Sequence, residues 1–275
     1  MKTIQLILTF SLIYFLHVKY ATAQEYESKE LNGITMYYRI NGEGEPLILL
    51  HGFTQTGNVW DSMIEDLSSK YRLIIPDLRG HGRSTNPTNE FTHRQSALDV
   101  FGLLDQLGID TFKAMGISTG GMTLLHMATT QRERVEAMVL IGATSYFPEQ
   151  ARVILRASSP DSLSDTRLER IGSRHSGGAE QARSLMAQFS GFQDSYDDMN
   201  FTRPYLSTIK ARTLIVHGDR DAFFPVSIPL EQYEAIPKSY LWIVPNGGHV
   251  PLIFSEISRD FFVHTVLTFL IGEWQ

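Results

Sequence analysis

The chain has 275 residues, of which 43% are hydrophobic and 20% are charged, and its formal net charge is -6 at pH 7. Such a composition is normal for a soluble globular protein. The acidic balance argues against a nucleic-acid partner, which would usually require a basic patch. Cysteine is absent, which excludes disulfides and cysteine-ligated metal sites.

The amino-terminal segment differs from the rest of the chain. Lys2 precedes a mostly apolar run, Ile4–Val18, and the sequence Ala-Thr-Ala ends the segment at residue 23. These features predict a secretory signal peptide over residues 1–23, with export to the periplasm or the medium after cleavage. An uncleaved anchor is the alternative, but a run of about 15 residues is shorter than the roughly 20 that span a membrane. We therefore expect no stable membrane insertion after cleavage.

Strand-like and helix-like segments follow in alternation. Near ITMYYRI, alternating residues predict a short strand pair with Asn41-Gly42 as its turn. Continuous apolar runs predict buried strands in PLILLHGF, YRLIIPDLRGHGRS, TFKAMGIS, EAMVLIGAT, ARTLIVHGDRD and SYLWIVPNGGH. Helical spacing predicts helices in GNVWDSMIEDLSSK, HRQSALDVFGLLDQLG, GMTLLHMATTQRERV and EISRDFFVHTVLTFLIGEW.

This alternation predicts an α/β protein with a mostly parallel sheet that is covered by helices on both faces. One interval, 144–208, contains no convincing strand but three helix-like segments, ARVILRA, DTRLERIG and EQARSLMAQFSGF. An ordinary crossover between strands rarely needs more than one helix. We therefore expect residues 144–208 to form a helical cap on a core made of residues 24–143 and 209–275.

The sequence GISTGG at residues 116–121 lies between a predicted strand and a predicted helix. Gly-x-Ser-x-Gly in this context is typical of a nucleophile elbow, a strained turn that exposes a serine at the end of a sheet. Ser118 is therefore the candidate nucleophile. The N–H of Thr119, at the start of the helix, is a candidate donor to an oxyanion.

A serine nucleophile needs a base, and the base needs an acid that orients it. The elbow predicts the chain order serine, acid, histidine, and His249 in PNGGHVP is the candidate base. Asp219 and Asp221 both follow the preceding strand. We favour Asp221, because its turn and the following Pro225 place it beyond the strand end, whereas Asp219 is expected to cap the turn.

The oxyanion hole needs a second donor, and the N–H of Phe53 follows the strand in PLILLHGF. Phe223 and Trp60 are candidates for an apolar substrate pocket. No His, Asp and Glu cluster has the spacing of a metal site, so we expect neither a metal nor another cofactor. Five cap arginines alternate with Asp and Glu, which favours a solvated face over a site for an acid group; they are Arg152, Arg156, Arg167, Arg170 and Arg174.

Together, HGF, DLRGHGRS, GISTGG, HGDRDAFFP and GGHVP resemble the motifs of the α/β-hydrolase superfamily over residues 30–275. The resemblance implies an eight-stranded, mostly parallel sheet, a helical cap after the sixth strand and a triad of Ser118, Asp221 and His249. It is strongest to the smaller capped esterases, lactonases and carbon–carbon bond hydrolases. Epoxide hydrolases and haloalkane dehalogenases differ, because they have aspartate at the nucleophile position.

The motifs therefore predict a serine hydrolase that cleaves a small-molecule carboxylic ester or lactone without a cofactor. Two other reactions use the same triad: hydrolysis of a carbon–carbon bond, and perhydrolysis or halide oxidation. A binding protein of the same fold without catalysis is a third possibility, although such proteins usually lose a triad residue. The sequence predicts neither the acyl length nor the oligomeric state.

Overall fold

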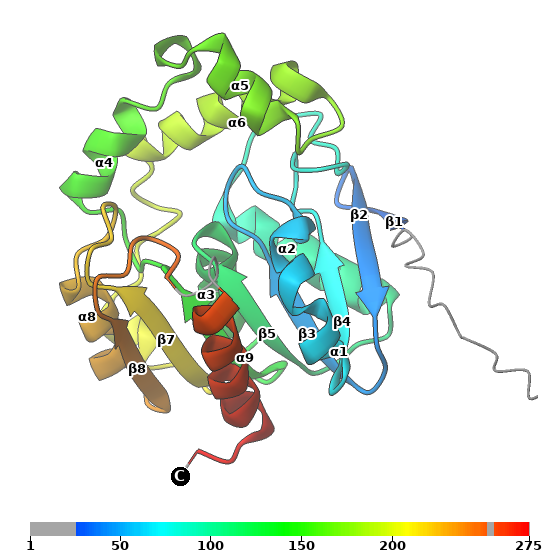
Figure 1. Cartoon of the computed structure of the whole chain (residues 1–275), viewed down its shortest axis with the longest axis vertical. Helices are drawn as coiled ribbons and strands as arrows, with labels where there is room; N and C mark the ends of the chain where they lie inside the picture. Colours follow the sequence, from blue (N-terminus) through cyan, green and yellow to red (C-terminus); the bar gives the residue numbers. More distant parts are fainter. Residues whose placement is uncertain (1–25, 252–255, 275) are drawn as a thin grey trace, which may run out of the picture.

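The computed structural model describes residues 26–251 and 256–274 (Figure 1). The predicted signal peptide and its cleavage site lie outside these residues. Within them, one eight-stranded sheet has the strand order β1-β2-β4-β3-β5-β6-β7-β8. The strands are β1 (Glu27–Leu31), β2 (Ile34–Asn41), β3 (Glu45–Leu50), β4 (Tyr71–Pro76), β5 (Phe112–Ile117), β6 (Val135–Ile141), β7 (Arg212–Gly218) and β8 (Ser239–Val244).

The sheet is parallel from β4 to β8, whereas β2 pairs antiparallel with both β1 and β4. The chain passes from β3 to β4 on one side and then returns to place β5 on the other side of β3. Ligands of open α/β sheets bind at such a reversal, outside the carboxyl ends of the strands. Leu50 at the end of β3 pairs with Gly116 near the end of β5, so the loops that follow these strands emerge side by side.

Helices cover both faces of the sheet (Figure 1). In β3, Ile48 and Leu50 pack into one apolar core, and Leu47 and Leu49 pack into the other, which explains the continuous apolar run. The first core includes side chains of α2 (His93–Gln106), α3 (Thr119–Thr130) and α8 (Ser227–Ala235), and the second includes those of α1 (Ile64–Ser68) and α9 (Glu256–Ile271).

The segment between β6 and β7 is helical, and we call it the cap. Its α-helices are α4 (Glu149–Arg156), α5 (Asp165–Gly172), α6 (Gly178–Gly191) and α7 (Arg203–Leu206), with 3-10 turns at Pro160–Ser162 and Phe192–Asp194. Figure 1 shows α4, α5 and α6 arching over one end of the sheet. Its only β-type pairing in the described part of the chain is an isolated bridge between Tyr146 and Asn200.

One local prediction was wrong, and a second was confirmed only in part. The turn between the first two strands is Asn32-Gly33, where both residues have positive φ, and not Asn41-Gly42. Asn41 instead pairs with Leu73 of β4. The helix expected over GNVWDSMIEDLSSK is a 3-10 helix, Gly57–Met63, followed by the single turn of α1. Over residues 26–251 and 256–274, every helix is too short or too polar to cross a membrane.

Asp198 fastens the cap to the core. Its carboxylate lies 2.7 Å from Nδ1 of His93 in α2, and its carbonyl oxygen lies 2.7 Å from Nε2 of His126 in α3. Burial lowers the pKa of His126 to about 4, although the nearby Asp198 charge opposes this shift. The interior therefore holds His126 as a neutral donor at neutral pH.

This arrangement predicts acid-sensitive stability. Between about pH 6.5 and 4 the unfolded chain binds a proton at His126 that the folded chain does not, so stability falls as the pH falls. His126→Gln keeps a donor but does not titrate. Its free energy of unfolding is expected to fall by about 3 kcal/mol less than that of the wild type over this interval. Urea titrations at neutral pH and at about pH 4 measure this difference; equal losses in both proteins contradict it.

Candidate active site

Ser118 lies at the sharp turn between β5 and α3. Its φ of 48° and ψ of -112° are unusual for a residue with a side chain. The turn is held by the Ser118 N–H, which donates to the Ile141 carbonyl at 2.7 Å, and by the Ser118 carbonyl, which accepts from Met122 at 2.9 Å. Strain of this kind persists only where the surrounding structure enforces it, and here it presents the serine hydroxyl beyond the sheet.

The glycines around Ser118 are required by close backbone contacts. A Cβ atom at Gly116 would lie 2.4 Å from the carbonyl carbon of Gly120, and a Cβ at Gly120 would lie 2.3 Å from the Leu50 carbonyl oxygen. Neither neighbour is a flexible side chain. The elbow therefore tolerates no side chain at these two positions without moving the backbone that places Ser118.

Gly116→Ala is expected to destabilise the fold by about 1–3 kcal/mol, because an added methyl group overpacks the turn. The displaced serine should also lower kcat by at least about tenfold. Gly191→Ala in α6 is a matched control, since its Cβ would meet no atom within 4 Å. Denaturant titration and a rate assay compare the two variants. Wild-type stability and rate in Gly116→Ala would contradict the close contact.

His249 and Asp221 complete a hydrogen-bonded chain with Ser118. The Nε2 atom of His249 lies 3.0 Å from Ser118 Oγ, and its Nδ1 atom lies 2.8 Å from Asp221 Oδ2. Asp221 follows β7 and His249 follows β8. The two loops are tied together by the Arg220 N–H, which donates to the Gly247 carbonyl at 2.8 Å. The imidazole can therefore exchange a proton with the hydroxyl while the carboxylate fixes its orientation.

The surroundings of Asp221 keep it ionised. Burial raises the pKa of this carboxyl, but the hydrogen bond and charge of His249 outweigh burial and bring the pKa below its usual value. The second oxygen, Oδ1, accepts from the N–H groups of Phe223 at 2.7 Å and Phe224 at 3.2 Å. Asp219, the alternative acid, is partly exposed and lies 3.9 Å from Arg220. The structure thus places Asp221, and not Asp219, against the imidazole.

The loop after β3 faces the serine from the neighbouring strand. The N–H groups of Phe53 and Thr119 donate to no acceptor within the described residues, and both residues line the cavity beside Ser118. Thr54 adopts a positive φ of 60°, and Gln55 Oε1 accepts from the Gly52 N–H at 3.2 Å. The loop after β3 thus brings Phe53, and the start of α3 brings Thr119, to the cavity that Ser118 also lines.

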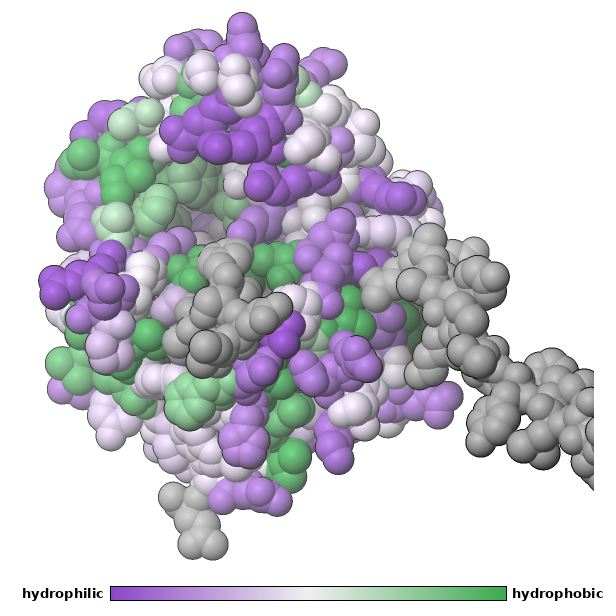
Figure 2. Space-filling view, in the orientation of Figure 1, coloured by the Kyte–Doolittle hydropathy of each residue, from purple (hydrophilic) through white to green (hydrophobic). Residues whose placement is uncertain are grey.

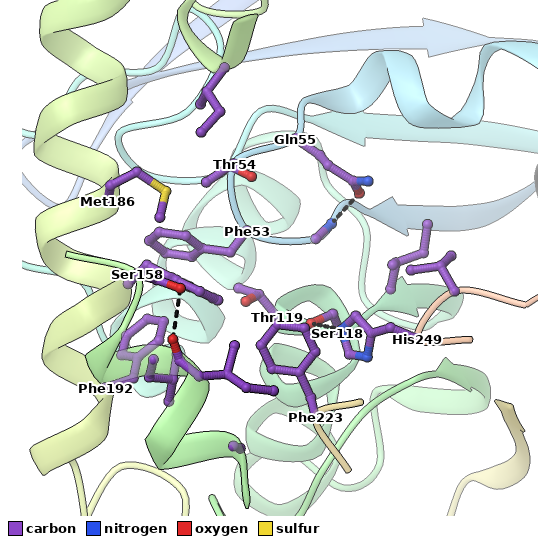
Figure 3. Close-up of a pocket in the computed structure, with 18 of the residues that line it drawn as sticks. Phe53, Thr54, Gln55, Ser118, Thr119, Ser158, Met186, Phe192, Phe223 and His249 are labelled. Carbon is purple, nitrogen blue, oxygen red and sulfur yellow. Dashed lines mark hydrogen bonds between the residues drawn. The ribbon is translucent and has the colours of Figure 1, made fainter. Parts of the chain in front are cut away.

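A cavity of about 430 Å³ opens onto Ser118 between the sheet and the cap, which is in the usual range for small-molecule sites. Figure 3 shows Phe223 beside His249, and Phe53, Met186 and Phe192 on the opposite side. The Phe223 and His249 ring centroids are 4.8 Å apart. The apolar side chains of its wall are Ile117, Met122, Phe147, Ala151, Ile154, Leu155, Ile171, Met186, Phe189, Phe192, Phe224 and Val250, besides Phe53 and Phe223.

Of the two predicted pocket residues, Phe223 lines this cavity and Trp60 does not. Trp60 belongs to the 3-10 helix before α1, and its side chain is fully buried in the core on the α1 and α9 face. That prediction was therefore wrong, because the aromatic ring serves core packing rather than the cavity.

Some residues of the site were not foreseen. No motif indicated that Gln55 belongs to the site, because a glutamine in a polar loop has no distinctive sequence pattern. The cap residues Met186, Phe189 and Phe192 have the spacing of one helix face. That spacing predicts an apolar face but does not distinguish a core from a cavity wall.

Comparison with known proteins agrees with this fold. A family model described as the alpha/beta hydrolase fold matches residues 45–176. A soluble epoxide hydrolase from Corynebacterium sp. is 37% identical over 111 residues, which is 40% of this chain and 39% of that protein. A pimeloyl-[acyl-carrier protein] methyl ester esterase from Nitrosomonas europaea is 25% identical over 252 residues, covering 80% of this chain and 94% of the esterase.

Among solved structures, a meta-cleavage product hydrolase from Pseudomonas fluorescens is 26% identical with a TM-score of 0.71, covering 89% of this chain and 97% of that one. With the strand order and the elbow, these similarities define the class: the chain is a member of the α/β-hydrolase superfamily. The similar proteins include hydrolases of several kinds and a putative non-heme chloroperoxidase, so they do not determine which reaction this one catalyses.

Proposed function

We propose that this protein is a serine hydrolase that cleaves a carboxylic ester or lactone through an acyl-enzyme. The main support is the continuous chain of hydrogen bonds from Ser118 Oγ to His249, at 3.0 Å, and from His249 to Asp221, at 2.8 Å. A serine hydroxyl is a weak nucleophile at neutral pH and needs such a base. The sequence match to the similar esterase also covers 94% of that protein.

In the first half of the proposed reaction, Ser118 Oγ attacks the ester carbonyl and His249 Nε2 takes the hydroxyl proton. The carbonyl oxygen becomes an oxyanion, which the N–H groups of Phe53 and Thr119 stabilise. The bond to the alcohol oxygen then breaks, and His249 returns the proton to that oxygen. Asp221 stays ionised throughout and stabilises the imidazolium ion.

In the second half, a water molecule replaces the alcohol. His249 takes a proton from this water, which attacks the acyl carbon, and the same two N–H groups hold the second oxyanion. The bond to Ser118 Oγ breaks, the proton returns to Ser118, and a carboxylic acid leaves. With a lactone, the acid and alcohol products are two ends of one molecule.

Hydrolysis of p-nitrophenyl esters from acetate to palmitate tests this proposal. The apolar cavity walls predict faster turnover as the acyl chain lengthens until the cavity is full. The expected result is a clear optimum in kcat/KM with chain length. Absence of turnover at every length, together with no reaction of Ser118 with a fluorophosphonate, would contradict the proposal.

Hydrolysis of a carbon–carbon bond is a second candidate. It is supported by the likeness to the meta-cleavage product hydrolase, at 26% identity over 89% of this chain. The test is to offer a vinylogous diketone alongside the esters and to identify the products. Preferred cleavage of the diketone, with a kcat/KM above that of every ester, would replace ester hydrolysis as the assigned reaction.

We further propose that the protein is exported after removal of residues 1–23. The support is the amino-terminal pattern, with Lys2, the apolar run Ile4–Val18 and the small residues before Gln24. Intact-mass analysis of protein from the producing cells is expected to find an amino terminus at Gln24 outside the cytoplasm. A full-length chain retained in the cytoplasm would contradict this proposal.

A further inference from the structure

Three arginines of the cap line the same cavity as Ser118. Arg167 and Arg170 belong to α5, and Arg174 follows its end. Side chains spaced by three and four residues lie on one face of a helix, and these three therefore form a row along the cap. We call them the cap arginine row. Among the described residues that line the cavity there is no aspartate or glutamate.

The cap arginine row has no acidic partner in the described parts of the chain, and its only side-chain hydrogen bond runs from Arg174 Nη1 to the Arg170 carbonyl at 3.2 Å. Other exposed arginines of the cap do have partners: Arg156 lies 3.8 Å from Glu149, and Arg183 lies 3.4 Å from Asp161. The alternation with acidic residues predicted a solvated face. The row is exposed, as that interpretation expects, but its acidic neighbours in sequence do not pair with it and its three residues line the cavity.

Like charges at helical spacing repel each other, and the chain as a whole has a net charge of -6. The positive charge of the unpaired row is therefore opposite in sign to the net charge of the chain. Guanidinium groups match the planar, two-oxygen geometry of carboxylates and bind other oxyanions well. The row consequently has the chemistry of an anion-binding site.

We propose that Arg167, Arg170 and Arg174 bind an oxyanion of the substrate, such as a carboxylate, so that the preferred ester or lactone carries a negative charge away from its scissile carbonyl. This inference rests on the proposed ester hydrolysis at Ser118. The apolar walls formed by Ile154, which lies on α4, and by other cap residues receive the uncharged part of the substrate. Figure 2 shows this combination, with hydrophilic side chains on the cap above a hollow that has apolar residues at its edge.

Matched pairs of substrates test the proposal. Half-esters of p-nitrophenol with dicarboxylic acids, from adipate to sebacate, are each compared with the p-nitrophenyl ester of the fatty acid of the same length. The pairs differ only in a terminal carboxylate. A second pair, 4-acetoxybenzoate and phenyl acetate, places the charge on the alcohol part. The measured quantity is the ratio of kcat/KM for the charged ester to that for the neutral ester.

The variant that replaces Arg167, Arg170 and Arg174 with glutamine is expected to lower this ratio by about tenfold or more in at least one series. The wild-type ratio should also fall as salt is added, since exposed charges are screened. Arg183→Gln, another cap arginine that does not line the cavity, is the control and should keep the wild-type ratio. Fluorophosphonate labelling of Ser118 verifies that each variant is folded.

An unchanged ratio in the triple variant, in both series, would overturn the cap arginine row as an anion site while leaving ester hydrolysis intact. Failure of the wild type to hydrolyse any ester, charged or neutral, together with no fluorophosphonate labelling of Ser118, would instead overturn the proposed function and this inference together.

Discussion

Ser118→Ala is expected to lower kcat for ester hydrolysis by about 10⁴-fold or more, to the level that binding and the oxyanion hole alone provide. The hydroxyl is the only group of the protein that forms a bond to the substrate carbon in the proposed reaction, and alanine removes that single oxygen. The elbow itself should persist, because its glycine contacts and backbone hydrogen bonds do not involve Oγ.

The measurement is a steady-state assay with the best ester of the chain-length series, with melting temperature as a check of folding. Ser207→Ala is a matched control, because that serine is exposed and its hydroxyl donates to the Pro204 carbonyl at 2.8 Å. It should keep the wild-type rate. A rate for Ser118→Ala within about tenfold of the wild type would be inconsistent with covalent catalysis at this residue.

Asp221→Asn is expected to lower kcat by about 10⁴-fold with little change in structure. An amide in place of the carboxylate can donate to Nδ1 of His249, which favours the tautomer that carries its proton on Nε2. That tautomer cannot accept the proton of Ser118. The amide also has no charge with which to stabilise the imidazolium ion formed during attack.

Asp219→Asn is the natural control for this variant. It removes a carboxylate two residues away, on the same loop, whose Oδ1 lies 3.9 Å from Arg220 Nε. We expect it to keep the wild-type kcat. The reverse result, a loss in Asp219→Asn and not in Asp221→Asn, would mean that the orienting acid had been assigned to the wrong residue.

The sheet was predictable because buried parallel strands leave a strong pattern. The apolar runs that end at Leu50 and Ile117 correspond to β3 and β5, and short-range rules suffice for them. Strands without an apolar pattern were harder to predict. The strand β1 has the sequence ESKEL and no apolar alternation, so the turn before ITMYYRI was assigned to the wrong Asn-Gly pair.

The candidate site was predictable where backbone geometry restricts residue type. Gly116 and Gly120 mark the elbow because their neighbours leave no room for a side chain. The cavity wall was less predictable, because an aromatic residue has the same periodicity whether it faces a core or a cavity. Trp60 illustrates the first case and Phe192 the second.

Charge on the cap was the hardest feature to infer. Arg167 and Arg170 alternate with Asp165 and Glu169 in sequence, which usually indicates mutual neutralisation. Only the fold shows that the two arginines line the cavity with Ser118 while the acids do not. Sequence spacing on one helix does not say which other element that helix faces.

The most direct test of the proposed mechanism is to trap the acyl-enzyme. Protein mixed rapidly with a p-nitrophenyl ester and quenched in acid is examined by intact-mass spectrometry and peptide mapping. The proposed mechanism predicts one acyl group per chain, attached to Ser118, that disappears on further incubation and never forms in Ser118→Ala. Ester hydrolysis without any adduct, or with an adduct at another residue, would contradict it.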